Sequence, residues 1–284
     1  MPRMSNGTLL YVTDLGYEAR GRRYCDEDIW LSGRLREEFD VALCHPRDAA
    51  TLMGRFDAVV VRNSGPVIHY REAYEEFRAA ARAGGVRVFN PLSGKGDMSG
   101  KGYLLDLFRE GYPVIPTVAR REDFGALPAA DAYVVKPVLG ADSVGLRFVN
   151  RAALDGVDPA GMLVQPRIPF AYEVSFYFVG RSFQYALYAP HPEARWVLEP
   201  YQPTAADLEF AQRFVDWNAL PHGIQRVDAC RAPGGELLLV ELEDLNPYLS
   251  LDRVGEKERE GFVRAMAASL RELVASPRPR PRPE

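Results

Sequence analysis

The sequence predicts a mixed fold, in which an α/β part with a parallel sheet is followed by an α+β part with antiparallel sheets. Over roughly the first ninety residues, short apolar runs alternate with segments of helical spacing, which is typical of βαβ units. From Tyr133 onward the apolar runs come in adjacent pairs, which is typical of antiparallel hairpins. A length of 284 residues favours two or three domains over a single core.

The first part is expected to form a small parallel sheet covered by helices. From Tyr70 to Ala81 the apolar side chains step by four, three and four, which places them on one helical face. The Gly84-Gly85 pair then ends this helix. The other elements expected here are a helix at 28–39 and strands at 8–12, 41–44, 58–61 and 86–89.

The second part is expected to consist of hairpins with a few helices. A segment rich in glycine and serine at 91–101 has the composition of a loop and separates the two parts. The expected strands are 113–118, 133–138 with 146–150, 173–179 with 182–189, and 224–231 with 236–243, and the expected helices are 102–109, 206–220 and 258–274. The predicted domains are 1–95, 96–170 and 171–275, followed by a disordered, proline-rich tail at 276–284.

Composition excludes several classes of protein. Apolar residues make up 47% and charged residues 26% of the chain, so most of it should fold. The formal net charge of −4 leaves no excess of positive charge for a nucleic-acid backbone. No apolar stretch approaches the roughly 20 residues that a bilayer span needs, and the N-terminus lacks the pattern of a secretory signal. We therefore expect a cytoplasmic protein without a nucleic-acid or membrane partner.

A lysine and a loop of small residues mark the end of the expected strand at 133–138. Lys136 stands near the end of the apolar run, Gly140 and Gly145 frame the loop, and Ser143 lies within it. Glycines let backbone N–H groups approach an anion closely, and a nearby lysine supplies a point charge for the same phosphate. The alternative is a plain hairpin with an exposed lysine. The spacing does not match the GxxxxGK[ST] pattern of a P-loop.

A second pattern places three acids and one arginine on one sheet face. If a Pro-Gly pair forms the turn, residues whose numbers add up to 467 face each other, so that Arg226 lies opposite Glu241. Because side chains alternate along a strand, Asp228 and Glu243 share that face, although a one-residue bulge would break this register. Three carboxylates repel one another, and Mg²⁺ prefers such oxygens. The pattern predicts a magnesium site, with a solvated acidic face partly neutralised by Arg226 as the alternative.

Two further segments carry candidate binding residues. Two prolines interrupt the segment from Gln165 to Ile168, which leaves backbone groups free for a ligand edge such as adenine, and Glu173 would then accept from ribose hydroxyls. An ordinary interdomain crossover is the alternative. Arg62 and Asn63 follow a strand of the parallel type, where open α/β sheets bind ligands. For Arg62, a clamp on a substrate carboxylate and an interdomain salt bridge are both open.

Taken in order, these segments resemble the ATP-grasp superfamily. They match its lysine strand with a small-residue loop, its proline-bearing hinge followed by an acid, and its Arg-x-Asp … Glu-x-Glu … Asn-Pro hairpin. Lys101 matches the second lysine of the family, so two of the four lysines fall at nucleotide positions. The resemblance covers roughly residues 86–250 and is nearest to the glutathione-synthetase-like and D-alanine–D-alanine-ligase-like members. Glu243, the loop with only two glycines, and Gly100 before Lys101 depart from the common pattern.

The resemblance implies a two-part ATP-grasp fold, in which antiparallel sheets clamp the nucleotide, and a carboxylate–amine ligase that forms an acyl phosphate and releases ADP and phosphate. The implied cofactors are ATP and one or two Mg²⁺, and the implied partners are a small carboxylate and an amine, of the amino-acid or small-peptide type. Homodimers are common in the family. A phosphotransferase on the same fold and a non-catalytic ATP-binding module remain open as alternatives.

The resemblance also implies a role for each candidate residue. The catalytic residue is Arg226, and the metal ligands are Asp228, Glu241 and Glu243. The ATP-binding residues are Lys101, Lys136, Gly140, Ser143, Gly145, Gln165, Ile168 and Glu173. The substrate-binding residues are Arg62, Asn63 and Asn246.

Overall fold

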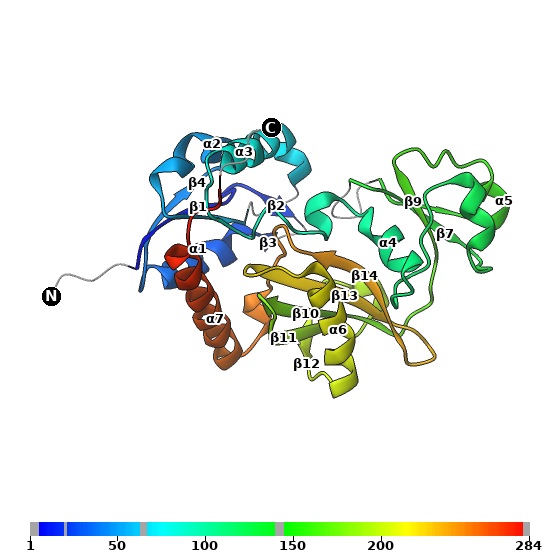
Figure 1. Ribbon diagram of the computed structural model, residues 1–284. Coiled ribbons are helices and arrows are strands. Elements are labelled where there is room, and N and C mark those ends of the chain that lie inside the picture. Colours follow the sequence, from blue (N-terminus) through cyan, green and yellow to red (C-terminus); the bar gives the residue numbers. More distant parts are fainter. Residues whose placement is uncertain (1–5, 20–21, 63–66, 140–144, 281–284) are drawn as a thin grey trace.

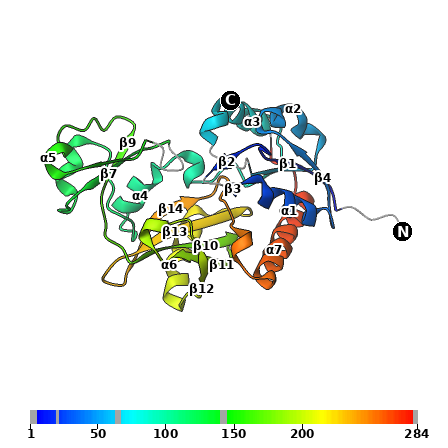
Figure 2. The same cartoon turned by 180° about the vertical axis from the view of Figure 1, so that it is seen from behind.

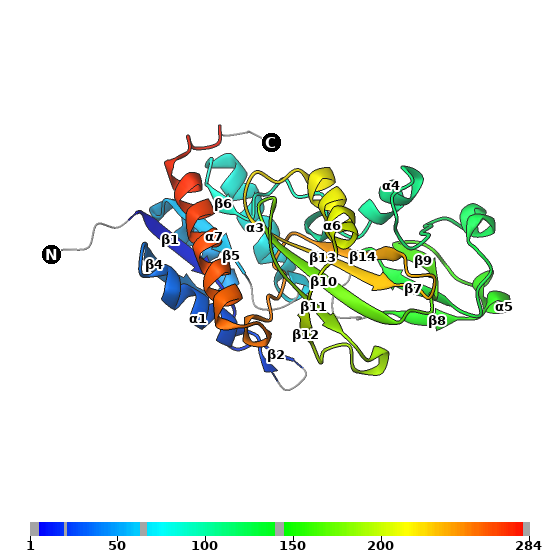
Figure 3. The ribbon, with the colours of Figure 1, turned by 90° about the horizontal axis from the view of Figure 1, so that it is seen from below.

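The computed structural model describes residues 6–19, 22–62, 67–139 and 145–280. Three sheets follow one another along the molecule, with a parallel sheet at one end, an antiparallel sheet in the middle and a smaller antiparallel sheet at the other end (Figures 1 and 3). The predicted fold class is confirmed, because a parallel α/β part precedes two antiparallel sheets.

The parallel sheet is formed by the N-terminal part of the chain. Its strands, in spatial order, are β4 (Asp40–Cys44), β1 (Thr8–Val12), β5 (Ala58–Val61) and β6 (Val88–Phe89). Along β1, Leu9 packs on the side of α1 and α7, and Leu10 packs on the side of α2 and α3. The sheet is therefore buried on both faces, as its uninterrupted apolar strands predict. The helices are α1 (Cys25–Leu35), α2 (Ala49–Leu52), α3 (Arg71–Ala83) and α7 (Glu256–Ala275).

The C-terminal helix α7 joins the parallel sheet to the middle sheet. Seen from behind, α7 lies beside α1 (Figure 2). Phe262 of α7 belongs to the same buried cluster as Leu9 of the parallel sheet and Tyr185 of the middle sheet. A small hairpin, β2 (Glu18–Ala19) with β3 (Arg22–Arg23), precedes α1.

One face of the middle sheet packs against two helices, whereas the other combines an apolar contact with α7, made by Tyr177, Tyr185 and Leu187, with a polar region. Its strands, in spatial order, are β12 (Glu199–Tyr201), β11 (Ser182–Ala189), β10 (Tyr172–Val179), β13 (Ile224–Arg231) and β14 (Leu237–Glu243). On one face Phe176 and Val227 pack against α4 (Tyr103–Arg109) and α6 (Ala205–Asn218). A capping box in which Thr204 and Asp207 bond each other's backbone starts α6. The other face carries the candidate site residues of β10, β13 and β14.

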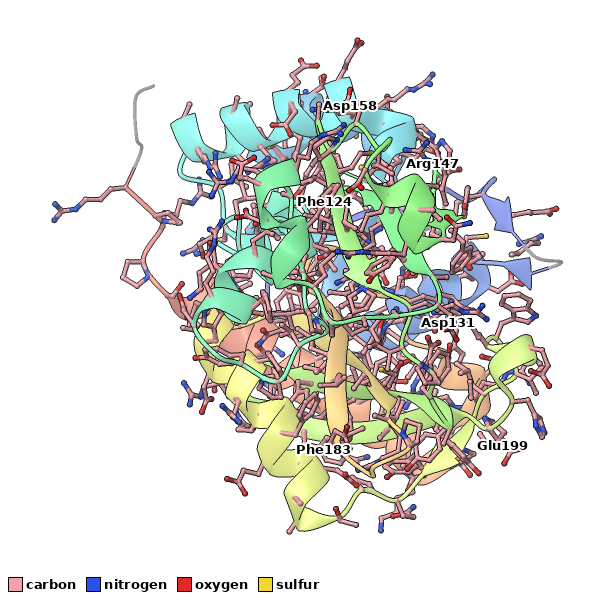
Figure 4. All side chains as sticks on the ribbon, turned by 90° about the vertical axis from the view of Figure 1, so that its right-hand side faces the viewer. Phe124, Asp131, Arg147, Asp158, Phe183 and Glu199 are labelled. Atoms are coloured by element: carbon pink, nitrogen blue, oxygen red, sulfur yellow. The ribbon has the colours of Figure 1, made fainter. Side chains whose placement is uncertain are left out.

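The third sheet lies at the end of the molecule away from the parallel sheet, and Figure 4 views the molecule from that end. Its strands, in spatial order, are β8 (Arg147–Val149), β7 (Tyr133–Pro137) and β9 (Met162–Pro166), and the short helix α5 (Arg151–Leu154) follows β8. Tyr133 and Val135 of β7 point into its own small core. Alternation along β7 therefore turns Lys136 to the opposite face.

The predicted strand at 113–118 is wrong. Val114 and Val118 form single bridges, to Leu239 of the middle sheet and to Val164 of the third sheet. Prolines at 113 and 116 remove two of the N–H groups that a continuous ladder would need. The segment instead links two sheets. The chain also contains short 3₁₀ helices at Pro46–Asp48, Met53–Arg55, Val67–Tyr70, Asp97–Ser99, Arg121–Ala126, Pro192–Ala194 and Leu251–Arg253.

The pairing of β13 with β14 also differs from the prediction. Arg226 lies opposite Glu243 and Asp228 lies opposite Glu241, and the register shifts between Asp228 and Ala229. The expected pairing of Arg226 with Glu241 is therefore wrong. Next to the turn the numbers of facing residues already add up to 468 instead of 467, and the bulge after Asp228 adds one more. At the Arg226 end the numbers of facing residues add up to 469, two more than expected. A displacement of two keeps all four side chains on one face.

Among the described residues, none of the helices combines the length and the apolar character that crossing a bilayer requires. The division of the chain into domains at 95/96 and 170/171 stays a proposal. In the predicted tail, residues 277–280 are exposed and have no regular structure, and residues 281–284 lie outside the described part of the chain.

Candidate active site

Arg226 lies between two of the three predicted metal-binding acids. Its Nε and Nη2 donate to the two carboxylate oxygens of Asp228 at 2.9 and 2.8 Å, and Nη2 also pairs with Glu243. Its Nη1 donates to the carbonyl oxygen of Tyr248 at 2.9 Å. Although burial works to lower the pKa of Arg226, Asp228 and Glu243 raise it well above its usual value. The guanidinium is therefore a permanent positive charge held in one orientation.

The two candidate lysines lie around the third acid, Glu241. The Nζ of Lys101 is 2.6 Å from a carboxylate oxygen of Glu241. Burial lowers the pKa of Lys136 to about 8, and Lys101 and Arg195 add to this effect while Glu241 opposes it. Such mutual influence requires these charged groups to lie near one another. The structure thus brings Lys101 of the segment before α4, Lys136 of β7 and Glu241 of β14 to one place.

A backbone contact sets the relative position of the two lysine segments. Lys101 donates its N–H to the carbonyl oxygen of Val138 at 2.9 Å, two residues beyond Lys136. Gly145 has a φ of +77°, and a Cβ there would lie 2.9 Å from Pro137, so a side chain would be strained and crowded. The small-residue loop is therefore confined where it rejoins the third sheet. Gly140 and Ser143 of this loop lie outside the described residues.

The surroundings of Glu243 disfavour its charged form. Burial raises the pKa of Glu243 to about 8, against the lowering effect of Arg226, and Asp228 and Glu241 raise it further. Ser175 of β10 donates to Asp228 at 2.6 Å and fixes the orientation of that carboxylate. An additional cation would relieve the repulsion that Glu243 experiences.

The three acids fit Mg²⁺ in their chemistry, because their carboxylate oxygens are the hard ligands that this ion prefers. Asp228 and Glu243 are held by Arg226, however, and Glu241 is held by Lys101. Within the described part of the chain, no three His, Cys, Asp or Glu residues are arranged as a ready set of metal ligands. That the three acids bind Mg²⁺ therefore stays a proposal. It requires Arg226 and Lys101 to give up some of their contacts with these carboxylates.

The predicted hinge begins within strand β9 of the third sheet and continues toward the middle sheet. Gln165 is buried and its side chain donates to the hydroxyl of Thr117 at 2.8 Å. Ile168 lies in the irregular segment between β9 and β10. Arg167 donates its N–H to the carbonyl oxygen of Ala132, so one of the backbone groups that we expected to be free for a ligand is already hydrogen-bonded. Glu173, expected to accept from ribose hydroxyls, pairs with Arg195 at 2.6 Å.

The predicted substrate residues separate into two groups. Arg62 is buried and pairs with Glu27 and Asp28 of the same N-terminal part, so its ion pairs do not join two domains, and its role as a substrate clamp stays a prediction. Asn246 donates to the backbone carbonyl oxygen of Arg62 at 3.1 Å, so both lie where the parallel sheet meets the end of the hairpin. Asn63 lies outside the described residues.

A buried carboxylate network supports the site and was missed in the sequence. Asp244 accepts N–H bonds from Gly96 and Met98, and Asp97 accepts N–H bonds from Asp244 and Leu245, all between 2.7 and 2.9 Å. This exchange fastens the loop before Lys101 to the strand that carries Glu241 and Glu243. The glycines of the loop were the available signal, since a Cβ at Gly96 would lie only 2.6 Å from the carbonyl oxygen of Leu242.

Several solved structures share this fold. D-cycloserine synthetase DcsG has a TM-score of 0.72 and 22% sequence identity, over 93% of this chain and 100% of that chain. The ATP-grasp ligase PsnB, complexed with a phosphomimetic variant of its minimal precursor, Mg and ADP, has a TM-score of 0.66 and 14% identity, over 93% and 98%. The D-alanine–D-alanine ligase of Bacillus anthracis, complexed with ATP, has a TM-score of 0.64 and 12% identity, over 95% and 96%.

The chain therefore has the fold of these ATP-grasp ligases, and the fold that its motifs indicate is confirmed. A comparison with protein-family models finds no match, and neither does a comparison with curated protein sequences.

Proposed function

We propose that the protein is an ATP-dependent ligase that joins a carboxylate to an amine through an acyl phosphate and releases ADP and phosphate. The observation that supports this most is the meeting of Lys101 with Glu241 and of Arg226 with Asp228 and Glu243 on adjacent strands. A module that only binds nucleotide has no need of an arginine held among acids beside the phosphate-binding lysines. The proposal is also supported by the similarity of the fold to those of several ATP-grasp ligases.

The proposed reaction has two steps. A carboxylate oxygen of the acid substrate attacks the γ-phosphorus, the bond from that phosphorus to the bridging oxygen breaks, and ADP leaves. The amine nitrogen then attacks the acyl carbon, the bond between that carbon and the phosphate oxygen breaks, and phosphate leaves while the nitrogen loses a proton. The protein has little covalent work to do and acts by positioning and by stabilising charge.

Each residue near the site has a proposed task. Lys101 and Lys136 bind α- and β-phosphate oxygens, and for Lys101 these oxygens replace Glu241 as the partner. Arg226 stabilises the charge that develops on the transferring phosphoryl group and on the tetrahedral intermediate. Bound at Asp228, Glu241 and Glu243, one or two Mg²⁺ would act as Lewis acids that polarise phosphoryl oxygens. Of the remaining predicted positions, Glu173 holds the ribose once its pairing with Arg195 is released.

The substrates are proposed to be amino acids or short peptides. Among the similar structures, one is named for a small molecule and another, the macrocyclase MdnC, is bound with its precursor peptide. A homodimer and a cytoplasmic location also remain proposals, and light scattering on the purified protein would decide the first.

The test is ADP release measured against a panel of single amino acids and short peptides, with hydroxylamine added in a parallel series. An acyl phosphate reacts with hydroxylamine to give a hydroxamate, so the proposal expects ATP-dependent hydroxamate with one member of the panel. A stable phosphorylated product without hydroxamate would instead indicate a phosphotransferase. Nucleotide binding without acceptor-dependent phosphate release would indicate a binding module.

A further inference from the structure

A group of buried charges lies between the parallel sheet and the end of the β13–β14 hairpin. Arg62 donates its Nε to Asp28 at 3.0 Å and its Nη2 to Glu27 at 3.2 Å, and the side chains of Arg62 and Glu27 are each only 4% exposed. Burying charges is costly, and apolar residues of similar size would often stabilise a protein as well. A buried ion pair of this kind can instead serve to hold another segment of the chain in one conformation.

The contact held here is the backbone of residues 247–251. Leu249 and Leu251 donate their N–H groups to the two carboxylate oxygens of Glu27, at 2.9 and 3.1 Å. Arg62 donates its Nη1 to the carbonyl oxygen of Pro247 at 2.7 Å. Between these anchors Ser250 has a φ of 52° and a ψ of 41°, the left-handed conformation that residues other than glycine rarely adopt. Two side chains of the N-terminal part thus impose the shape of this loop.

The same loop holds the guanidinium of Arg226. Tyr248 lies between the anchored residues Pro247 and Leu249, and its carbonyl oxygen accepts Nη1 of Arg226 at 2.9 Å. The other donors of Arg226 go to carboxylates, namely Asp228 and Glu243. The carbonyl oxygen of Tyr248 carries no charge and is not a proposed metal ligand. It can therefore keep Nη1 of Arg226 in a fixed direction when Asp228 and Glu243 bind Mg²⁺.

We propose that Glu27 and Arg62 are positioning residues for Arg226, which act through the loop 247–251 and the carbonyl oxygen of Tyr248. The proposal rests on the proposed function in so far as Arg226 is the catalytic residue. In this role Glu27 and Arg62 act on Arg226 through the loop and need no contact of their own with nucleotide or substrate. They make the orientation of the reactive centre in the middle sheet depend on the N-terminal part of the chain.

The main test is Glu27→Gln. This variant keeps the size of the side chain but replaces one carboxylate oxygen by an NH₂ group, which cannot accept a hydrogen bond from a backbone N–H. We expect kcat for acceptor-dependent ADP formation to fall at least tenfold, while KM for ATP changes less than twofold. The matched control is Asp57→Asn, because Asp57 also accepts an N–H bond in the N-terminal part, from Thr8, and does not contact the loop. An equal fall of kcat in both variants would overturn the proposal.

A double-mutant cycle separates positioning from a general structural effect. If Glu27 acts through Arg226, then Glu27→Gln in an Arg226→Lys background should change kcat less than twofold, because the contact that it supports is already altered. If Glu27→Gln lowers kcat by the same factor in the Arg226→Lys background as in the wild type, the proposal is overturned. If Glu27→Gln fails to fold by circular dichroism, Glu27→Asp replaces it, since this variant keeps the charge but draws the carboxylate away from the loop.

A readout that does not depend on activity distinguishes failure of this proposal from failure of the proposed function. The Nε–H resonance of Arg226 in a ¹⁵N-labelled protein is assigned by its loss in Arg226→Lys. It should shift in Glu27→Gln and stay unchanged in Asp57→Asn. If wild-type protein forms no ADP with any acceptor, the proposed function fails, and an unchanged resonance in Glu27→Gln would separately exclude the positioning role.

Discussion

The N–H of Lys101 donates to the carbonyl oxygen of Val138 over 2.9 Å, which fixes two lysine-bearing segments from different parts of the chain at a constant separation. Lys136 lies two residues before Val138 on the same run of chain. The two ammonium groups are thus arranged by backbone geometry, and Glu241 balances their charge from the middle sheet. Substitutions at these positions should affect phosphate binding far more than folding.

Lys136→Ala is expected to abolish acceptor-dependent ADP formation while leaving the fold intact. Because burial disfavours the charged form of Lys136, removal of this cation takes away a phosphate ligand at little cost to the free energy of unfolding. Steady-state ADP release should fall by at least about 100-fold, the scale of one lost charge-stabilising contact. Lys257→Ala, at an exposed position of α7, is the matched control and should keep full activity. Full activity in Lys136→Ala would count heavily against the proposed site.

The lowered pKa of Lys136 predicts how nucleotide affinity depends on pH. The ammonium form binds phosphate, and burial lowers the pKa of this group to about 8. Affinity should therefore be constant below pH 8 and fall as the pH rises above 8, by up to roughly tenfold per unit. Isothermal titration of an unreactive ATP analogue between pH 6.5 and 9.5 measures this. Lys136→Arg, which stays charged, should make the fall shallower and leave only the part due to Glu243, whose pKa is also about 8. An unchanged pH profile in that variant would contradict the assignment.

Glu241→Ala is also expected to abolish acceptor-dependent ADP formation without unfolding the protein. It removes both the partner of Lys101 and one of the proposed magnesium ligands. The Mg²⁺ concentration needed for half-maximal binding of an unreactive ATP analogue should rise compared with wild type. Glu236→Ala, an exposed acid at the turn of the same hairpin, is the control that should leave the magnesium dependence unchanged. Equal magnesium curves for both variants would argue against a metal at this acid.

Arg226→Lys keeps one positive charge but cannot contact Asp228, Glu243 and Tyr248 together in the way that the planar guanidinium does. We expect kcat to fall by roughly 10²–10³, as for the loss of one group that stabilises a developing charge, with nucleotide affinity little changed. Single-turnover measurements would place the loss in the chemical steps. A loss confined to nucleotide affinity would mean that Arg226 binds ATP and does not act in the transition state.

Gly96→Ala tests the loop that approaches the end of β14. A Cβ at Gly96 would lie 2.6 Å from the carbonyl oxygen of Leu242, so the loop or the strand must shift. Overpacking of this kind costs about 1–3 kcal/mol of unfolding free energy. Gly33→Ala is the matched control, because nothing lies within 4 Å of its Cβ position in α1, and it should stabilise the protein by roughly 0.5–1 kcal/mol. Chemical denaturation of both variants compares them directly.

The sequence predicted the features that depend on local pattern. The helix over Arg71–Ala83, the hairpin strands and the shared face of Arg226 and Asp228 all follow from apolar spacing and alternation, which are properties of a single segment. The register of β13 with β14 could not be predicted, since the pairing is displaced by one residue at the turn and by one more at the bulge after Asp228, and no residue type marks either displacement.

The partners that Arg62 and Asp97 find in the folded chain could not be predicted from the sequence either. Arg62 and Glu27 are near neither each other nor residues 247–251 along the chain, so nothing in the local pattern decides between a substrate clamp and an ion pair. The pairing of Asp97 with the backbone of Asp244 is hidden for the same reason. The glycines at 94 and 96 indicated a close approach but could not identify the strand that approaches.

The packing of α7 has a consequence for synthesis on the ribosome. Leu9 and Tyr11 of the first strand are covered by Phe262 and Met266 of the last helix. Strand β1, which α1 covers only in part on this side, therefore keeps some of its apolar surface exposed until α7 has been translated. Nascent chains stalled before residue 256 should bind trigger factor or Hsp70 chaperones through this strand, whereas chains that extend past residue 275 should be released from them.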